Sequence, residues 1–201
     1  QLGKLRKNRG EILFNIPEVD VSVDSLGRVV ELKKREVNES HKMIESFMIS
    51  ANETIAHEFL KNKIPFVYRV HEVPDGEKID RFTHVLDSAG IQYKINKENI
   101  TSADIQKILE KTVGNPNEYA INRICLRSMK KAKYSPDCLG HFGLASKEYC
   151  HFTSPIRRYP DLTIHRIIKD CLHNAMNGKN MAFYKNFVVE SSMRSSEREK
   201  L

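Results

Sequence analysis

Hydrophobic residues change their spacing along this chain of 201 residues, and the change predicts where strands give way to helices. Val19, Val21 and Val23 alternate with polar residues, which is the period of a half-buried strand. We expect short strands at residues 12–14, 19–23 and 28–32. Residues 24–27, Asp-Ser-Leu-Gly, supply a turn, so the last two strands should form a hairpin.

From Ser40 onward the apolar residues recur at helical spacing. Ile44, Met48 and Phe59 share one face and predict a helix over residues 40–62. We expect further helices at residues 78–89, 102–109, 118–131, 155–176 and 181–201, an extended segment at 66–70 and a loop-rich stretch at 134–153. The predicted fold class is α+β and helix-rich, with a small antiparallel sheet near the N-terminus. Exposed edges of that sheet could pair with another copy of the chain.

Composition describes a basic chain that can bury a core. Lys and Arg number 33 against 26 Asp and Glu, giving a net charge of +7, and 40% of the residues are hydrophobic. The charge suggests an anionic partner without identifying it.

The four cysteines form no C-x-x-C pair, which argues against zinc, and no metal site is predicted within the chain. No signal peptide and no apolar run near the ~20 residues of a membrane span is found, so we expect a cytoplasmic protein with no membrane partner.

Residues 149–166, YCHFTSPIRRYPDLTIHR, place two adjacent arginines beside an expected helix start. Ser154 and Pro155 are typical of an N-cap followed by proline at N1. Arg157 and Arg158 would then oppose the helix dipole, an unfavourable placement that indicates phosphate binding rather than simple solvation. They would lie about 100° apart, so one should reach the ligand while the other pairs with an acid or supports the loop. Pro160 should kink the helix or delay its start.

Other candidate groups each have a structural alternative. Glu45, at the border of the apolar helix face, could act as a general base or support a metal-bound water, or it could form an ordinary ion pair. Phe14 could stack on a nucleobase or lie in the core. Glu197 taken alone is a solvated charge. Three histidines match no metal-ligand spacing and are expected to make structural hydrogen bonds: His141, His151 and His165.

The string HFTSPIRRYPD resembles the signature of the ribonuclease II and ribonuclease R family, the processive, hydrolytic 3′-to-5′ exoribonucleases, and is closest to ribonuclease R. Five further segments occur in the family's order and at roughly the family's spacing: RGEILF, MIESFMISANETIA, PFVYRVHEVP, LRSMKKAKYSP and SERE. The resemblance therefore covers nearly the whole chain, and the parent reaction it implies is release of nucleoside 5′-monophosphates from the 3′ end of single-stranded RNA.

The resemblance also implies roles for individual residues. Three match catalytic positions: Arg157, which contacts RNA phosphates, Glu45, near the catalytic centre, and Glu197, linked to activity. Phe14 matches the aromatic residue that clamps stacked bases at the RNA 3′ end. The remaining implied RNA-binding residues belong to the signature loop and should line or brace the RNA channel: His151, Thr153, Ser154 and Arg158.

Several family features are missing from this sequence. The family carries an aspartate cluster, roughly D-x-x-x-x-x-D-x-D-D, that holds magnesium ions, together with cold-shock and S1 domains. None of these is found here, and the last residues continue a charged helical pattern. We therefore expect residues 1–201 to be the C-terminal portion of an RNB-type catalytic domain, inactive alone, with its Mg²⁺ ligands elsewhere. A non-catalytic RNA-binding adaptor and a helical protein-interaction domain remain alternatives.

Overall fold

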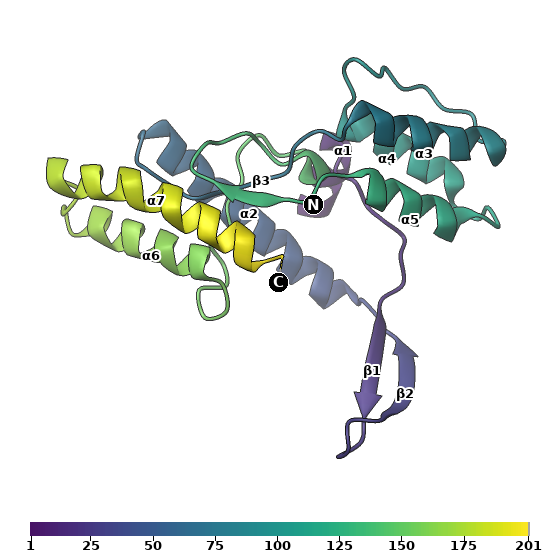
Figure 1. Cartoon of the computed structure of the whole chain (residues 1–201), viewed down its shortest axis with the longest axis horizontal. Coiled ribbons are helices and arrows are strands. Elements are labelled where there is room, and N and C mark those ends of the chain that lie inside the picture. The colour runs from purple at the N-terminus through teal and green to yellow at the C-terminus, as the bar shows by residue number, and fades with distance from the viewer. Residues whose placement is uncertain (201) are drawn as a thin grey trace.

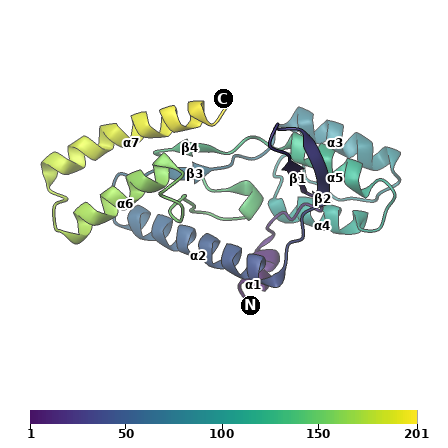
Figure 2. The same ribbon diagram turned by 90° about the horizontal axis from the view of Figure 1, so that it is seen from below.

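The computed structural model describes residues 1–200, in which two groups of helices lie at opposite ends of the body (Figure 1). One end holds α3 (Gly76–Ser88), α4 (Ser102–Thr112) and α5 (Glu118–Ser128). The other holds α6 (Tyr159–Leu172) and α7 (Gly178–Arg198). The long helix α2 (Glu39–Lys61) lies on the opposite side from α7, with α6 and the small strands between them (Figure 2). The helix-rich α+β class expected from the sequence is confirmed.

Two small antiparallel sheets are present in residues 1–200. The first pairs β1 (Val19–Val23) with β2 (Val29–Lys34), which confirms the predicted hairpin. The second pairs β3 (Tyr68–Val70) with β4 (Lys133–Ser135) and lies within the body. The hairpin was expected to be half-buried, and this is wrong. Every residue of β1 and β2 is exposed, because the hairpin projects away from the body (Figure 1).

The N-terminal segment differs from its prediction, because it begins with a helix and the short strand expected at residues 12–14 does not form. Residues 2–9 form α1 (Leu2–Arg9), which ends at Gly10 in the left-handed conformation, φ 97°. Residues 12–14 join no strand ladder. Instead the Ile12 amide donates to the carbonyl of Gly143 at 2.8 Å, and the Leu13 amide donates to Oε1 of Gln106 at 2.7 Å. Tertiary partners therefore satisfy the extended backbone that the sequence pattern assigned to a sheet.

Side-chain caps begin three of the seven α-helices in residues 1–200, α2, α4 and α7, near the expected residues. The Asn38 side chain accepts from the His41 amide at 3.0 Å to begin α2, and Thr101 and Asp104 cap each other at the start of α4. The Asn177 side chain accepts from the Asn180 amide at the start of α7. Helix α5 ends at Ser128, short of the expected residue 131, because residues 133–135 join β4. The expected end of the last helix, Leu201, lies outside the described residues.

Each end of the body has its own hydrophobic core. Helices α3, α4 and α5 enclose the first, whose fully buried members include Ile79, Phe82 and Ile121. Helices α2, α6 and α7 enclose the second around β3 and β4, with Phe66 and Ile164 at its centre. In the described part of the chain, no helix has the length and apolar character to cross a membrane.

Candidate nucleic-acid interface

A groove of about 810 Å³ separates the signature loop from the C-terminal half of α7. We call it the arginine groove, because four of its lining residues are arginines: Arg157, Arg158, Arg194 and Arg198. Glu197 lines the same groove. The tertiary structure therefore brings together three of the predicted site residues, Arg157, Arg158 and Glu197, from segments some forty residues apart in the sequence.

The helix after the signature loop begins later than expected. Residues 155–157 form a turn, and Ser154 accepts through its carbonyl oxygen from the amides of Arg157 and Arg158 at 3.3 and 3.1 Å. Helix α6 begins at Tyr159, with Arg158 as N-cap. Pro160 explains the delay, since a proline lacks the N–H that an interior helical position needs and is tolerated only in the first turn. The predicted Ser154 N-cap is thus wrong, and both arginines precede the helix.

Asp161 forms an ion pair with only one of the two adjacent arginines. Its Oδ2 accepts from Nη2 of Arg158 at 2.7 Å and from the Ser154 amide at 2.8 Å, and the side chain is fully buried. The expectation that one arginine pairs with an acid is confirmed for Arg158. Arg157 is exposed and makes no ion pair within residues 1–200. Its guanidinium is therefore available to an anionic ligand in the arginine groove.

His151, within the signature loop, makes structural contacts. Its Nδ1 lies 3.0 Å from the hydroxyl of Tyr134, and the two rings meet edge-to-face. Burial, followed by the nearby charge of Arg158, lowers the pKa of His151 to about 3. A neutral imidazole is therefore favoured at ordinary pH, which agrees with the predicted structural hydrogen bond. The Thr153 hydroxyl, next to Ser154, is buried and has no hydrogen-bond partner among the described residues.

The other two histidines also make the structural contacts expected of them. His165 stacks on Phe152 with ring centroids 4.5 Å apart, and its Nε2 lies 2.9 Å from the Phe152 carbonyl oxygen. Nδ1 of His141 accepts from the Leu144 amide at 3.3 Å. Burial lowers the pKa of His141 to about 3. Both rings therefore help to order the loop between β4 and α6, and the lowered pKa of His141 favours its neutral form.

Two supports of the groove were missed in the sequence. Arg69 of β3 forms a two-pronged ion pair with Glu199, at 2.6 and 2.9 Å, and its guanidinium lies 4.6 Å from the centroid of the Tyr134 ring. This pair fixes the end of α7, and therefore Glu197, against the sheet of β3 and β4. Asn52 of α2 is buried and accepts from the Phe152 amide at 2.9 Å. A polar residue next to an apolar helix face was the available signal for Asn52.

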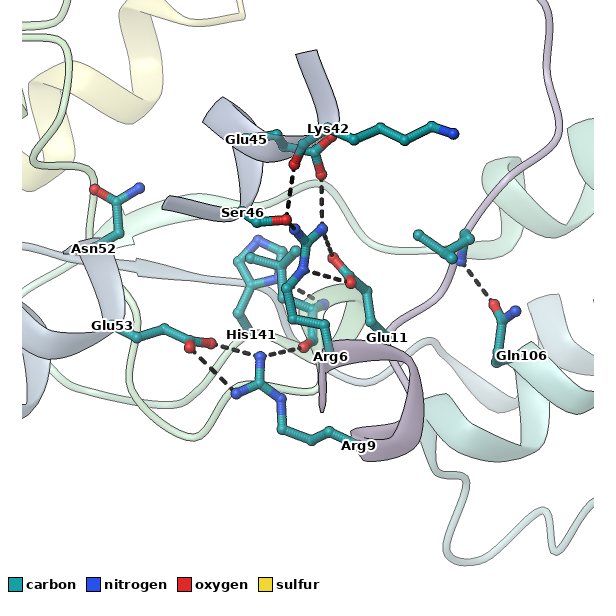
Figure 3. A network of polar contacts seen from close by, with 12 residues as sticks. Arg6, Arg9, Glu11, Lys42, Glu45, Ser46, Asn52, Glu53, Gln106 and His141 are labelled. Carbon is teal, nitrogen blue, oxygen red and sulfur yellow. Dashed lines mark hydrogen bonds and ion pairs between the residues drawn. The ribbon is translucent and has the colours of Figure 1, made fainter. Parts of the chain in front are cut away.

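Glu45 lies in a separate charged network (Figure 3). Arg6 of α1 donates to Oε1 of Glu45 at 2.7 Å, to both carboxylate oxygens of Glu11 at 2.7 Å and to Ser46 Oγ at 3.1 Å. The ion-pair alternative for Glu45 is therefore realised. Glu45 does not line the arginine groove, so its catalytic role stays a prediction. The network instead joins α1 to α2 beside the segment that carries Phe14.

Phe14 lies apart from the arginine groove as well. Its ring is partly buried and packs against the core formed by α3, α4 and α5. One side borders a smaller pocket of about 490 Å³, which Ile12, His71 and Met129 also line. The contact fits a core role and leaves part of the ring accessible from this pocket. Stacking on a nucleobase stays a prediction.

The groove is suited to an anion rather than to a metal ion. Of its carboxylates, Glu190 pairs with Arg194 at 2.6 Å and Glu199 pairs with Arg69. One further carboxylate, Glu197, does not make the oxygen-rich set that Mg²⁺ requires. No group of three or more potential metal-ligating side chains occurs in residues 1–200. The donor chemistry of this region therefore does not fit a magnesium site.

Comparison with known proteins identifies the family. The family model described as "RNB domain" matches residues 1–174. The chain belongs to the RNB domain family. It is 46% identical over 178 residues to ribonuclease R of Thermotoga maritima, and 40% identical over 203 residues to ribonuclease R of Aquifex aeolicus. These alignments cover 88% and 100% of this chain but 25% and 28% of those proteins. The chain thus spans about a quarter of the length of these RNB relatives.

Solved RNB structures show the same fold. The apo form of Mycoplasma genitalium RNase R superimposes with a TM-score of 0.93 at 31% identity, covering 98% of this chain and 31% of that one. The complex of the same RNase R with double-stranded RNA gives a TM-score of 0.92, also at 31% identity, covering 98% of this chain and 36% of that one. The chain therefore shares the fold of a segment of that RNase R over 98% of its length, which includes the loop and most of the helices that form the arginine groove.

Proposed function

We propose that this chain is the C-terminal portion of the catalytic domain of a hydrolytic 3′-to-5′ exoribonuclease that releases nucleoside 5′-monophosphates. The observation that carries the proposal is the arginine groove, where an exposed Arg157 faces the wall formed by α7. Family membership and the RNase R complexes with single-stranded and double-stranded RNA support RNA as the ligand. A single-stranded 3′ end is the substrate that the sequence resemblance implies.

The two arginines have different parts in this proposal. Arg157 binds a backbone phosphate near the scissile bond, where a guanidinium can hold two oxygens and stabilise charge that develops during hydrolysis. Arg158 does not bind RNA directly but braces the loop through Asp161, together with Ser154. Thr153 and His151 complete the loop, and Glu197 acts from the opposite wall. Phe14 and Glu45 act at some distance from this groove.

Magnesium is the cofactor that we propose for the whole protein. Divalent ions would supply an activated water and stabilise the leaving oxygen. The described residues do not fit such a site, so the ligands would come from carboxylates outside this chain. By itself the chain should therefore bind RNA weakly and not cleave it. A cytoplasmic location and self-association through the edges of the β1–β2 hairpin stay predictions.

The proposal is tested with the purified chain and with the full-length protein. Fluorescently labelled single-stranded RNA is titrated with the chain and, separately, incubated with it and Mg²⁺. We expect salt-sensitive binding, weaker for Arg157→Ala, and no mononucleotide release. Arg81→Ala is the matched control, because Arg81 is exposed on α3 and makes no ion pair within the described residues. Robust mononucleotide release by the chain alone would refute the assignment of the metal ligands.

The full-length protein separates the enzyme from a non-catalytic adaptor. We expect the wild type to release 5′-mononucleotides in Mg²⁺, and Arg157→Ala to lower kcat by at least the ~10²-fold typical of losing one transition-state donor. Arg81→Ala should retain wild-type activity. A full-length protein that binds RNA tightly but releases no nucleotides would support the adaptor instead.

A further inference from the structure

A second groove, of about 550 Å³, also borders the end of α7. We call it the lysine groove. Glu199 lines both this groove and the arginine groove, so the two meet at the last turn of α7. Its cationic side chains come from β3, the start of α3, the segment before β4, β4 itself and the residues just after α7: Arg69, Lys78, Lys130, Lys131, Lys133 and Lys200.

Positive charge is in excess in the lysine groove. Two carboxylates, Glu72 and Glu199, lie among its six cationic side chains. Asp75, beside the groove, pairs with Lys130 at 2.8 Å. With all three acids counted, an excess of three positive charges remains. This density of like charge in one concave surface is unfavourable for the free chain and favours a polyanionic ligand.

The cations of the lysine groove fall into two sets. Lys133 and Lys130 hold Glu72 at 2.6 and 3.5 Å, and these pairs lower the pKa of Glu72. Arg69 pairs with Glu199, whereas Lys78, Lys131 and Lys200 make no ion pair within residues 1–200. The paired lysines therefore shape the wall, whereas Lys78 and Lys131 have ammonium groups available to a ligand.

The lining chemistry selects backbone phosphate over base. No aromatic side chain among the described residues lines the lysine groove, so it offers no surface for base stacking. Helix α3 also begins here, and its N-cap, Asp75, makes no side-chain hydrogen bond to the helix because its carboxylate pairs with Lys130. Lysines bind phosphate as point charges, without dependence on sequence.

We propose that the lysine groove is a second, sequence-independent contact for the backbone of an RNA strand whose other contact is the arginine groove. Lys78 and Lys131 bind the phosphates. The proposal rests on the proposed function, because it takes the same polymer as ligand. It adds a site on α3 and before β4 that the signature loop does not provide.

The test measures how salt weakens RNA binding by the purified chain. Anisotropy titrations with labelled poly(U) and poly(A) oligonucleotides between ~50 and ~200 mM salt give the slope of log K against log salt. Removal of one lysine that neutralises a phosphate of single-stranded RNA reduces this slope by about 0.7, so Lys78→Ala/Lys131→Ala should reduce it by about 1.4 for both oligonucleotides. The matched control, Lys61→Ala/Lys185→Ala, removes two exposed lysines of α2 and α7.

The outcomes separate this proposal from the proposed function. The proposal for the lysine groove would be overturned if the salt slope of Lys78→Ala/Lys131→Ala equals that of the wild type, or if it falls only as much as the slope of the control variant. If Arg157→Ala then still weakens RNA binding, the arginine groove remains supported as an RNA contact and the lysine groove does not. If the lysine variant lowers the slope while Arg157→Ala does not, the proposed function fails instead. The charge reversal Lys78→Glu/Lys131→Glu should weaken binding further, with thermal melts showing that each variant is folded.

Discussion

Replacement of Asp161 is the most direct test of how the signature loop is held. Its carboxylate is fully buried and joins the Arg158 guanidinium to the Ser154 amide. Asp161→Ala removes both contacts and leaves the cation of Arg158, whose side chain is 19% exposed, without its partner. Asp161→Asn keeps a carbonyl oxygen but removes the negative charge.

The expected cost follows from these contacts. Removal of one partner of a buried ion pair typically costs about 3–5 kcal/mol, and the partial exposure of Arg158 places Asp161→Ala near the lower limit. Asp161→Asn should cost about 1.5–3 kcal/mol, the usual value of one hydrogen bond to a charged group. Urea unfolding followed by circular dichroism measures both values as free energies of unfolding.

The control is Asp137→Asn, because Asp137 is exposed and makes no ion pair within the described residues. It should change stability by less than about 0.5 kcal/mol. RNA binding by Asp161→Asn should fall under conditions where the chain stays folded, since Arg157 shares the loop that Asp161 holds. A free energy of unfolding for Asp161→Ala within about 0.5 kcal/mol of the wild type, the usual effect of a surface change, would refute the reasoning.

Three further predictions concern other supports of the fold. Because burial holds the pKa of His141 and of His151 near 3 while an unfolded imidazole titrates near 6.5, the unfolded state binds protons first as pH falls. Urea unfolding should therefore show a loss of about 1.4 kcal/mol for each ring between pH 7.5 and 5.5, and a flat profile would contradict this. Gly10→Ala should destabilise the chain by about 1–3 kcal/mol in the same assay, because φ is 97° and a Cβ would lie 2.6 Å from a neighbouring side chain, whereas Gly3→Ala, in open space on α1, should not. Asn52→Ala should cost about 2 kcal/mol by losing two buried hydrogen bonds, and faster amide exchange at residues 149–153 would report the released loop.

Local sequence was a good guide to the elements of the fold. The hairpin over residues 19–34, the long helix α2 and the three helices at residues 76–128 lie close to their expected ranges, because strand alternation, helical spacing and capping residues act within a few positions. Residues 12–14 show where this fails. Their short apolar run is typical of a strand, but the Ile12 and Leu13 amides bond to a distant carbonyl and to a glutamine side chain.

Burial and pairing could not be derived in the same way. The valines of β1 alternate as in a half-buried strand yet are 54–57% exposed, since no other element of residues 1–200 covers them. Arg6, a charged residue of the basic N-terminal segment, is 9% exposed and forms ion pairs with Glu45 and Glu11. Both outcomes depend on which distant segment lies nearby, which local periodicity does not encode.

The sequence by itself determined the family and the helical content, and it predicted a functional loop around Arg157, because each depends on residue types at fixed local spacing. Only the tertiary structure decided which arginine is available. Asp161 neutralises Arg158 from inside the core, whereas Arg157 is left facing α7 across the groove. The physical reason is that a buried carboxylate is costly without a partner, and Arg158 is the arginine close enough to pair with Asp161. The turn before α6 sets the distance between the Arg158 guanidinium and the Asp161 carboxylate.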